Sequence, residues 1–147
     1  MQGRLLLMSV AALSGCSGPE LVRPDIPPGS TASTALVYRE PAFNSGGATM
    51  RFGEDGKAYL TLDNAQFGEV RIASGPHRFT VGATGTRDFA LDVSLTPNTT
   101  TCIKAYADPM NLAKVLTPIL MNLTSTFKME VVPCPEQEFL KGYERSS

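Results

Sequence analysis

A strict alternation of apolar and polar residues between positions 89 and 96 is the feature that most constrains the fold. The apolar members are Phe89, Leu91, Val93 and Leu95. Successive side chains of a β-strand point to opposite faces, so this period of two predicts a strand with one buried face and one wet face. A chain built from such segments buries its apolar residues by pairing strands into sheets.

Other short runs of the same character fill most of the chain, and turn residues separate them. We expect further strands at 35–39, 48–52, 57–62, 66–72, 77–83, 99–106 and 126–132. Asp55-Gly56 is a hairpin signal, and Asp63-Asn64 and Pro97-Asn98 mark further turns. Regular short strands with this punctuation predict an all-β fold, a small antiparallel β-sandwich.

The segment 108–116 differs, because its apolar residues recur at helical spacing. Asp108 suits an N-cap and Pro109 suits the first helical position, whereas Pro118 should kink or end the helix. We therefore expect one short helix in the C-terminal half. Its apolar stripe packs on the sheet as core or, alternatively, binds a partner or a membrane.

The first 15 residues have the organisation of an export signal. A basic tip that ends at Arg4 precedes the apolar run 5–13, which is too short to span a bilayer. Leu13-Ser14-Gly15-Cys16 then resembles the lipobox of bacterial lipoproteins. That resemblance implies that Cys16 receives a diacylglyceryl group and becomes the acylated first residue of the mature protein. The alternative is an ordinary signal peptide with a chance cysteine.

The lipobox resemblance also implies a location in the cell, and the residues that follow divide the rest of the chain. Enterobacterial lipoproteins with Asp after the lipid-bearing cysteine tend to stay in the inner membrane, so Ser17 implies the outer membrane, facing the periplasm. Residues 16–33 are proline-rich and predict a semi-extended tether; alternatively, Leu21, Val22 and Ile26 pack against the domain. We expect the sandwich over 34–134 and a C-terminal tail over 135–147.

The chain has three cysteines, so lipidation of Cys16 leaves Cys102 and Cys134. An export signal directs them to an oxidising compartment, where disulfides persist, and we expect the two to bond. The alternative is two free thiols or a bond to another chain. The parity of the strand 99–106 places Cys102 with Lys104 on the polar face, so we expect the bridge at a sheet edge.

Several further stretches together resemble a known family. They are Ala35-Leu-Val-Tyr-Arg39, Gly68-Glu-Val-Arg-Ile-Ala-Ser-Gly-Pro-His-Arg-Phe-Thr-Val81 and Leu95-Thr-Pro-Asn-Thr-Thr-Thr-Cys-Ile-Lys-Ala-Tyr106. Residues 34–107 thereby resemble the DUF2846-type bacterial lipoproteins and the related PEGA-like domains. The resemblance implies a small envelope β-sandwich whose shared motifs are structural rather than catalytic.

The composition narrows the possible functions. With 13 basic and 14 acidic side chains, nothing indicates a nucleic-acid surface. His77 is the single histidine and lacks a Gly-x-Ser-x-Gly partner, so we interpret it as a hydrogen-bonded residue at a strand start. The acidic turns do not have EF-hand spacing. We therefore expect no catalytic residue, no metal and no cofactor.

These observations predict a non-enzymatic binding or structural module of the bacterial envelope. Its expected partners are membrane lipid, through acylated Cys16, and an envelope protein. The alternative function is that of a periplasmic inhibitor or of an accessory lipoprotein in secretion or envelope assembly. Such proteins also use small disulfide-bonded β-domains on lipid anchors, and a single stoichiometric partner would favour this class.

Overall fold

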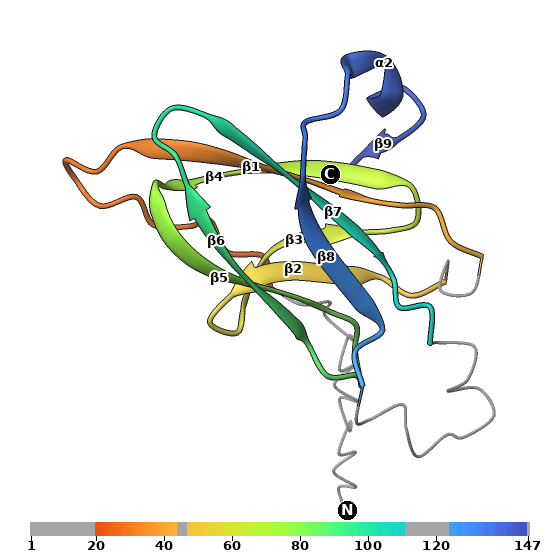
Figure 1. The fold of residues 1–147 in the computed structure, drawn as a ribbon. Helices are drawn as coiled ribbons and strands as arrows, with labels where there is room; N and C mark the ends of the chain where they lie inside the picture. Colours follow the sequence, from red (N-terminus) through yellow and green to blue (C-terminus); the bar gives the residue numbers. More distant parts are fainter. Residues whose placement is uncertain (1–19, 44–46, 111–123, 147) are drawn as a thin grey trace, which may run out of the picture.

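The computed structural model describes residues 20–43, 47–110 and 124–146, which form two β-sheets (Figure 1). The four-stranded sheet has the order β3 (Lys57–Leu62), β2 (Met50–Glu54), β5 (Gly75–Gly82) and β6 (Phe89–Leu95). The five-stranded sheet has the order β8 (Phe127–Val132), β7 (Thr100–Ala107), β1 (Ala32–Arg39), β4 (Gln66–Ala73) and β9 (Glu144–Arg145). One short helix, α2 (Gln137–Leu140), lies in the described part of the C-terminal half. The predicted all-β, sandwich-like fold is confirmed.

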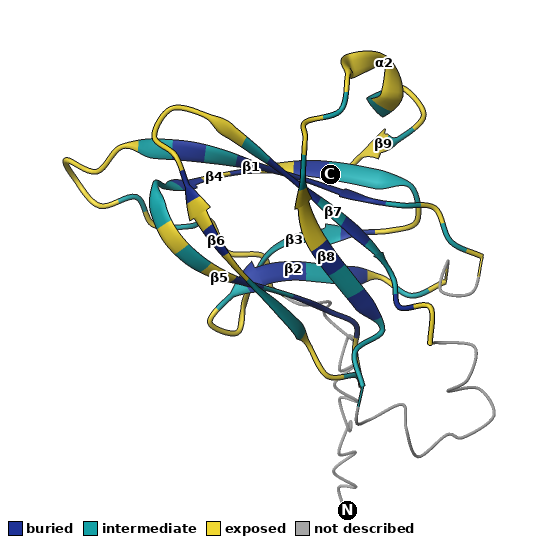
Figure 2. Ribbon diagram, in the orientation of Figure 1, coloured by how far each residue is buried: buried dark blue, intermediate teal, exposed yellow. Residues whose placement is uncertain are grey.

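The strands form where the apolar alternation predicts them. Phe79 and Val81 of β5 are fully buried, and Val93 and Leu95 of β6 are 8 % and 2 % exposed. Figure 2 shows this as alternating buried and exposed segments along the strands. The inner faces of both sheets meet in one apolar core, because each strand directs every second side chain inward.

The turn chemistry is also as predicted between β2 and β3. Asp55 and Gly56 both have positive φ, 51° and 76°, which is the conformation of a two-residue type I′ hairpin turn. Just before this turn the β2–β3 register shifts between Phe52 and Gly53. A side chain at Gly53 would collide with the Lys57 carbonyl oxygen, 1.7 Å from the position of a Cβ, so only glycine fits this bulge.

The two sheets differ in strand direction. All neighbours in the four-stranded sheet are antiparallel. In the five-stranded sheet β1 runs parallel to β7, and β4 runs parallel to β9. No tight hairpin joins either parallel pair, since β7 enters this sheet from β6 in the other one. The five-stranded sheet is therefore mixed rather than purely antiparallel as predicted, because its parallel pairs join segments far apart in the sequence.

The helix expected over 108–116 falls mostly outside the described residues. Asp108 and Pro109 are described, and the Asp108 carboxylate accepts a hydrogen bond from the Met110 backbone N–H at 3.0 Å, as an N-cap side chain does. The short helix that the structure does describe, α2, lies instead in the segment that the sequence assigned to a tail. Among the described residues, none of the helices is long and apolar enough to cross a membrane.

Candidate functional site

Cys102 and Cys134 are joined by a disulfide. Their sulfur atoms are 2.06 Å apart and their Cα atoms are 5.0 Å apart, which lies within the normal range for this bond. Cys102 belongs to β7, whereas Cys134 follows β8 at the start of the C-terminal segment. The bond closes a loop over a sequence separation of 32 and fixes the start of that segment to the sheet.

The predicted position of Cys102 needs a correction. Parity does place it on the outer face of the sheet with Lys104, but Cys102 is only 1 % exposed and β7 is an inner strand. A second apolar cluster covers this outer face, consisting of Leu36, Tyr38 and Cys102 with Phe67, Val132, Leu140 and Tyr143 packed against them. We call it the outer cluster. The strand period identifies a face correctly, but it does not reveal what a distant segment lays over that face.

Residues of the C-terminal segment cover this outer face of the five-stranded sheet. The rings of Phe139 and Tyr143 each meet Tyr38 edge-to-face, with centroids 5.7 Å apart in both pairs. The backbone N–H groups of Glu144 and Ser146 donate to Ala65 and Phe67 at 3.0 and 2.8 Å, so β9 extends the sheet beside β4 (Figure 1). Residues assigned by sequence to a tail are thus part of the folded domain.

Burial in the outer cluster changes the acidity of its tyrosines. Desolvation raises the pKa of Tyr38 above its usual 10.0, and the nearby Lys104 charge partly offsets this. Desolvation also raises the pKa of Tyr143, with a further increase from the Glu40 charge. Lys104 donates to Glu130 at 2.8 Å, and this hydrogen bond raises the lysine pKa above 10.5. The cluster therefore favours neutral tyrosines and a charged lysine.

His77 lies at the third position of β5, as predicted, and both of its ring nitrogens face acceptors. Nδ1 is 3.0 Å from Oε2 of Glu54, and Nε2 is 2.8 Å from the carbonyl oxygen of Ala73. The ring also stacks on Phe79, with centroids 5.3 Å apart and the planes nearly parallel. Glu54, which the sequence did not single out, further accepts the backbone N–H of Arg78 at 2.9 Å.

The hydrogen bonds of His77 connect β5 with the end of β2 and with the end of β4. A carboxylate beside a histidine can orient it as a general base, but the second ring nitrogen must then face a substrate or nucleophile. Here Nε2 faces the Ala73 carbonyl instead. Glu54 and His77 tie the end of β2 to the point where the chain passes from β4 to β5. The sequence could not pair them, because 23 residues separate the two.

Arg39 is a second residue that the sequence did not single out. It ends β1, is 1 % exposed, and donates from Nη1 to the carbonyl oxygens of Ala48 and, at 3.0 Å, Leu62. Its guanidinium lies over the Phe127 ring, 4.6 Å from the centroid. Burial lowers the pKa of Arg39, and the Asp63 charge partly offsets this. The side chain joins three separate segments at one end of the core.

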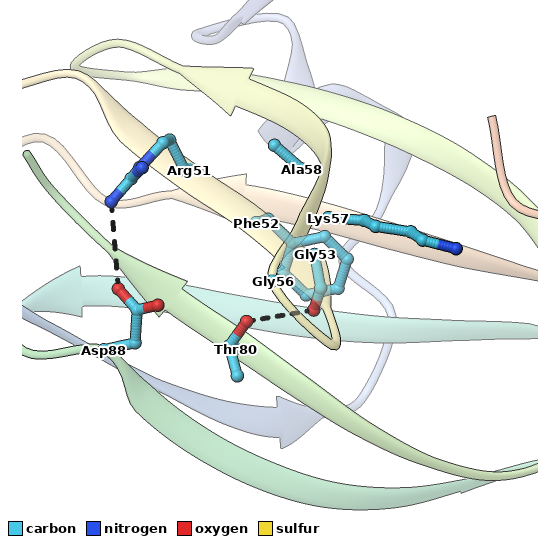
Figure 3. A pocket seen from close by; sticks show the side chains of 8 residues that line it. All are labelled: Arg51, Phe52, Gly53, Gly56, Lys57, Ala58, Thr80 and Asp88. Atoms are coloured by element: carbon cyan, nitrogen blue, oxygen red, sulfur yellow. Dashed lines mark hydrogen bonds and ion pairs between the residues drawn. The ribbon is translucent and has the colours of Figure 1, made fainter. Parts of the chain in front are cut away.

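The hollow in Figure 3 is too small for an organic ligand. It lies among β2, β3 and β5 and has a volume of about 40 Å³, enough for a few water molecules. Thr80 donates to the Gly53 carbonyl oxygen at 3.4 Å, and Arg51 lies 4.0 Å from Asp88 across its mouth. Elsewhere in the described ranges, no group of three histidine, cysteine or acidic side chains is placed to hold a metal ion.

The predicted lipidation site, Cys16, lies outside the described residues. Comparisons with protein-family models, with curated proteins and with solved structures find no significant match to this chain. The resemblance of residues 34–107 to the DUF2846-type lipoproteins and PEGA-like domains therefore stays a prediction. The structure itself defines the class of domain: a two-sheet, all-β fold whose outer cluster is fastened by one disulfide.

Proposed function

We propose that this chain is a bacterial envelope lipoprotein whose domain is a non-enzymatic binding or structural module. Acyl groups on Cys16 hold it in the outer membrane, and the domain faces the periplasm. The observation that carries the proposal is the Leu13-Ser14-Gly15-Cys16 motif at the end of a short apolar run. The motif resembles a lipobox at each of its four positions and stands where a signal peptide is processed.

The cysteine arrangement supports the same compartment. Of the three cysteines in the sequence, Cys102 and Cys134 bond to each other, which leaves Cys16 as the odd one. Disulfides persist in exported proteins and are rare in a reducing cytosol. An odd cysteine immediately after a signal-like segment has a clear use as a lipid acceptor, and two or more acyl chains give a stable membrane anchor.

The chemistry of the described polar groups supports a module without catalysis. Two side chains that often take part in catalysis or binding, those of His77 and Arg39, form hydrogen bonds with carbonyl groups of their own chain. Their hydrogen bonds connect separate strands. A domain of this kind acts through its surface, by contact with an envelope protein. Crosslinking in the intact envelope, followed by purification of the lipidated protein, identifies that contact.

Metabolic labelling with palmitate tests the anchor. The wild-type protein should incorporate the label and fractionate with the outer membrane, because acylation of Cys16 holds it there. Cys16→Ser should abolish incorporation. Mass spectrometry of the N-terminal peptide supplies an independent measurement of the acyl groups.

Cys134→Ser is the matched control, because it also removes one cysteine but leaves the lipobox intact. It should incorporate palmitate as the wild type does. Incorporation that persists in Cys16→Ser would refute the proposal, and so would its loss in Cys134→Ser alone.

A further inference from the structure

The folded domain begins well before the first predicted strand. Leu21 forms a parallel β-bridge with Ala58 of β3, and the Val22 backbone N–H donates to the Ala58 carbonyl oxygen at 2.8 Å. Val22 and Ile26 continue along a groove of about 390 Å³ that Tyr59 also lines. The segment assigned to a free tether is therefore attached to the edge of the four-stranded sheet from Leu21 onward.

This attachment leaves a short connection to the anchor. Leu21 is five residues from Cys16, and five fully extended residues span at most about 18 Å. The headgroup layer of a bilayer takes up roughly 5–7 Å of that length. A domain of this size is about 34 Å across. The connection is thus too short to bring the opposite side of the domain to the membrane.

We infer that one face of the domain lies on the lipid headgroups, namely the face around Leu21, Val22, Arg23 and Lys57. This inference rests on the proposed acylation of Cys16. The partner of this face is the bilayer that holds the acyl groups. The β2–β3 hairpin then lies at the membrane, while α2 and the outer cluster point toward the periplasm. Figure 1 shows the hairpin and α2 on opposite sides of the molecule.

The chemistry of this face is compatible with a headgroup layer. Leu21 and Val22 are 44 % and 39 % exposed, and apolar side chains next to basic ones suit the membrane interface. Arg23 and Arg71 line the adjoining groove, where the acidic Glu69 is already paired with Arg145. Acidic residues also lie nearby, at Glu20, Asp25 and Asp55. The short connection, rather than net charge, therefore sets the orientation.

Lysine acetylation by a water-soluble reagent tests the inference on the lipidated protein. The acylated protein is purified, placed in phosphatidylethanolamine–phosphatidylglycerol vesicles and compared with a soluble form that begins at Ser17 and carries no acyl group. Lys57, at the start of β3, should react several times more slowly on vesicles. Lys141, which is exposed just after α2, should react equally in both states and serves as the internal control.

A variant with a longer connection separates orientation from anchoring. An insertion of about 20 glycine and serine residues between Ser17 and Gly18 gives a mean span of about 25 Å. It should keep the acyl groups and restore the reactivity of Lys57. Equal Lys57 reactivity on vesicles and in solution, in protein whose Cys16 carries the acyl mass, would overturn this inference alone. Absence of the acyl mass would overturn the proposed function and this inference with it.

Discussion

At the scale of single residues, buried and partly buried polar side chains connect the strands at the ends of the sandwich. Arg39 places its guanidinium between the carbonyl oxygens of Ala48 and Leu62, and Glu54 joins His77 to the backbone of Arg78. Buried carbonyl groups that lose their donors cost more free energy than the hydrogen bonds contribute on formation. Loss of one of these side chains should therefore lower the free energy of unfolding by more than loss of an exposed polar side chain.

Replacement of Arg39 tests this argument. Arg39→Met keeps much of the apolar stem but removes the donors to the carbonyl groups of Ala48 and Leu62 and the contact with the Phe127 ring. We expect the free energy of unfolding to fall by about 2–5 kcal/mol, measured by urea denaturation.

Arg78→Met is the matched control for that measurement. Arg78 is 66 % exposed and pairs with Asp92 at 2.9 Å on the surface. Exposed ion pairs of this kind contribute about 1 kcal/mol or less. An Arg39 variant that is no less stable than the Arg78 variant would contradict the role assigned to the buried guanidinium.

At the scale of elements, the C-terminal segment 134–146 is attached to the five-stranded sheet at both of its ends. It is fastened at one end by the Cys102–Cys134 disulfide and at the other by the pairing of β9 with β4. Between these points Leu140 and Tyr143 cover Leu36 and Tyr38. The outer cluster exists only while this segment is in place, because it is built on a face that would otherwise be in water.

Removal of the disulfide should weaken the attachment of the C-terminal segment to the sheet and destabilise the domain. For a sequence separation of 32, the chain-entropy relation gives a loss of about 3–4 kcal/mol in Cys134→Ala. Urea denaturation measures this loss, and amide exchange at Glu144 and Ser146 should quicken because β9 loses its tie.

The reductant supplies the control for this variant. Dithiothreitol should lower the urea midpoint of the wild type to that of Cys134→Ala and leave the variant itself unchanged. A wild type whose midpoint does not respond to complete reduction would contradict a stabilising role for the bond.

At the scale of the whole molecule, local patterns predict the strands but not what covers them. The segment 57–62 has the predicted bounds of β3, and the Asp55-Gly56 turn has its expected conformation, because both depend on neighbouring residues. The burial of Cys102 depends on residues some 40 positions later, and the bridge of Leu21 to Ala58 joins segments 37 positions apart. Neither contact leaves a periodic signal in the sequence. The apolar residues Leu21, Val22 and Ile26 indicated packing against the domain only as an alternative to a tether, and the cover over Cys102 could not be predicted.

The outer cluster makes the stability of the whole domain sensitive to alkaline pH. The native pKa values of Tyr38, Tyr143 and Lys104 all lie above the usual values of 10.0 for tyrosine and 10.5 for lysine. The unfolded chain therefore loses these protons at a lower pH than the native protein does. The free energy of unfolding is highest below about pH 9.5 and falls as the pH rises from the unfolded pKa values to the native ones.

Urea denaturation between pH 8 and pH 11.5 measures this dependence, and absorbance at 295 nm reports tyrosine ionisation in the same samples. The free energy of unfolding should be level up to about pH 9.5 and then decline as the unfolded tyrosines ionise. Tyr38→Phe removes one of the buried phenols but keeps the ring that meets Phe139 and Tyr143 edge-to-face. Its decline above pH 10 should be shallower than that of the wild type, whereas an equal or steeper decline would show that the Tyr38 hydroxyl is not among the groups that couple ionisation to unfolding.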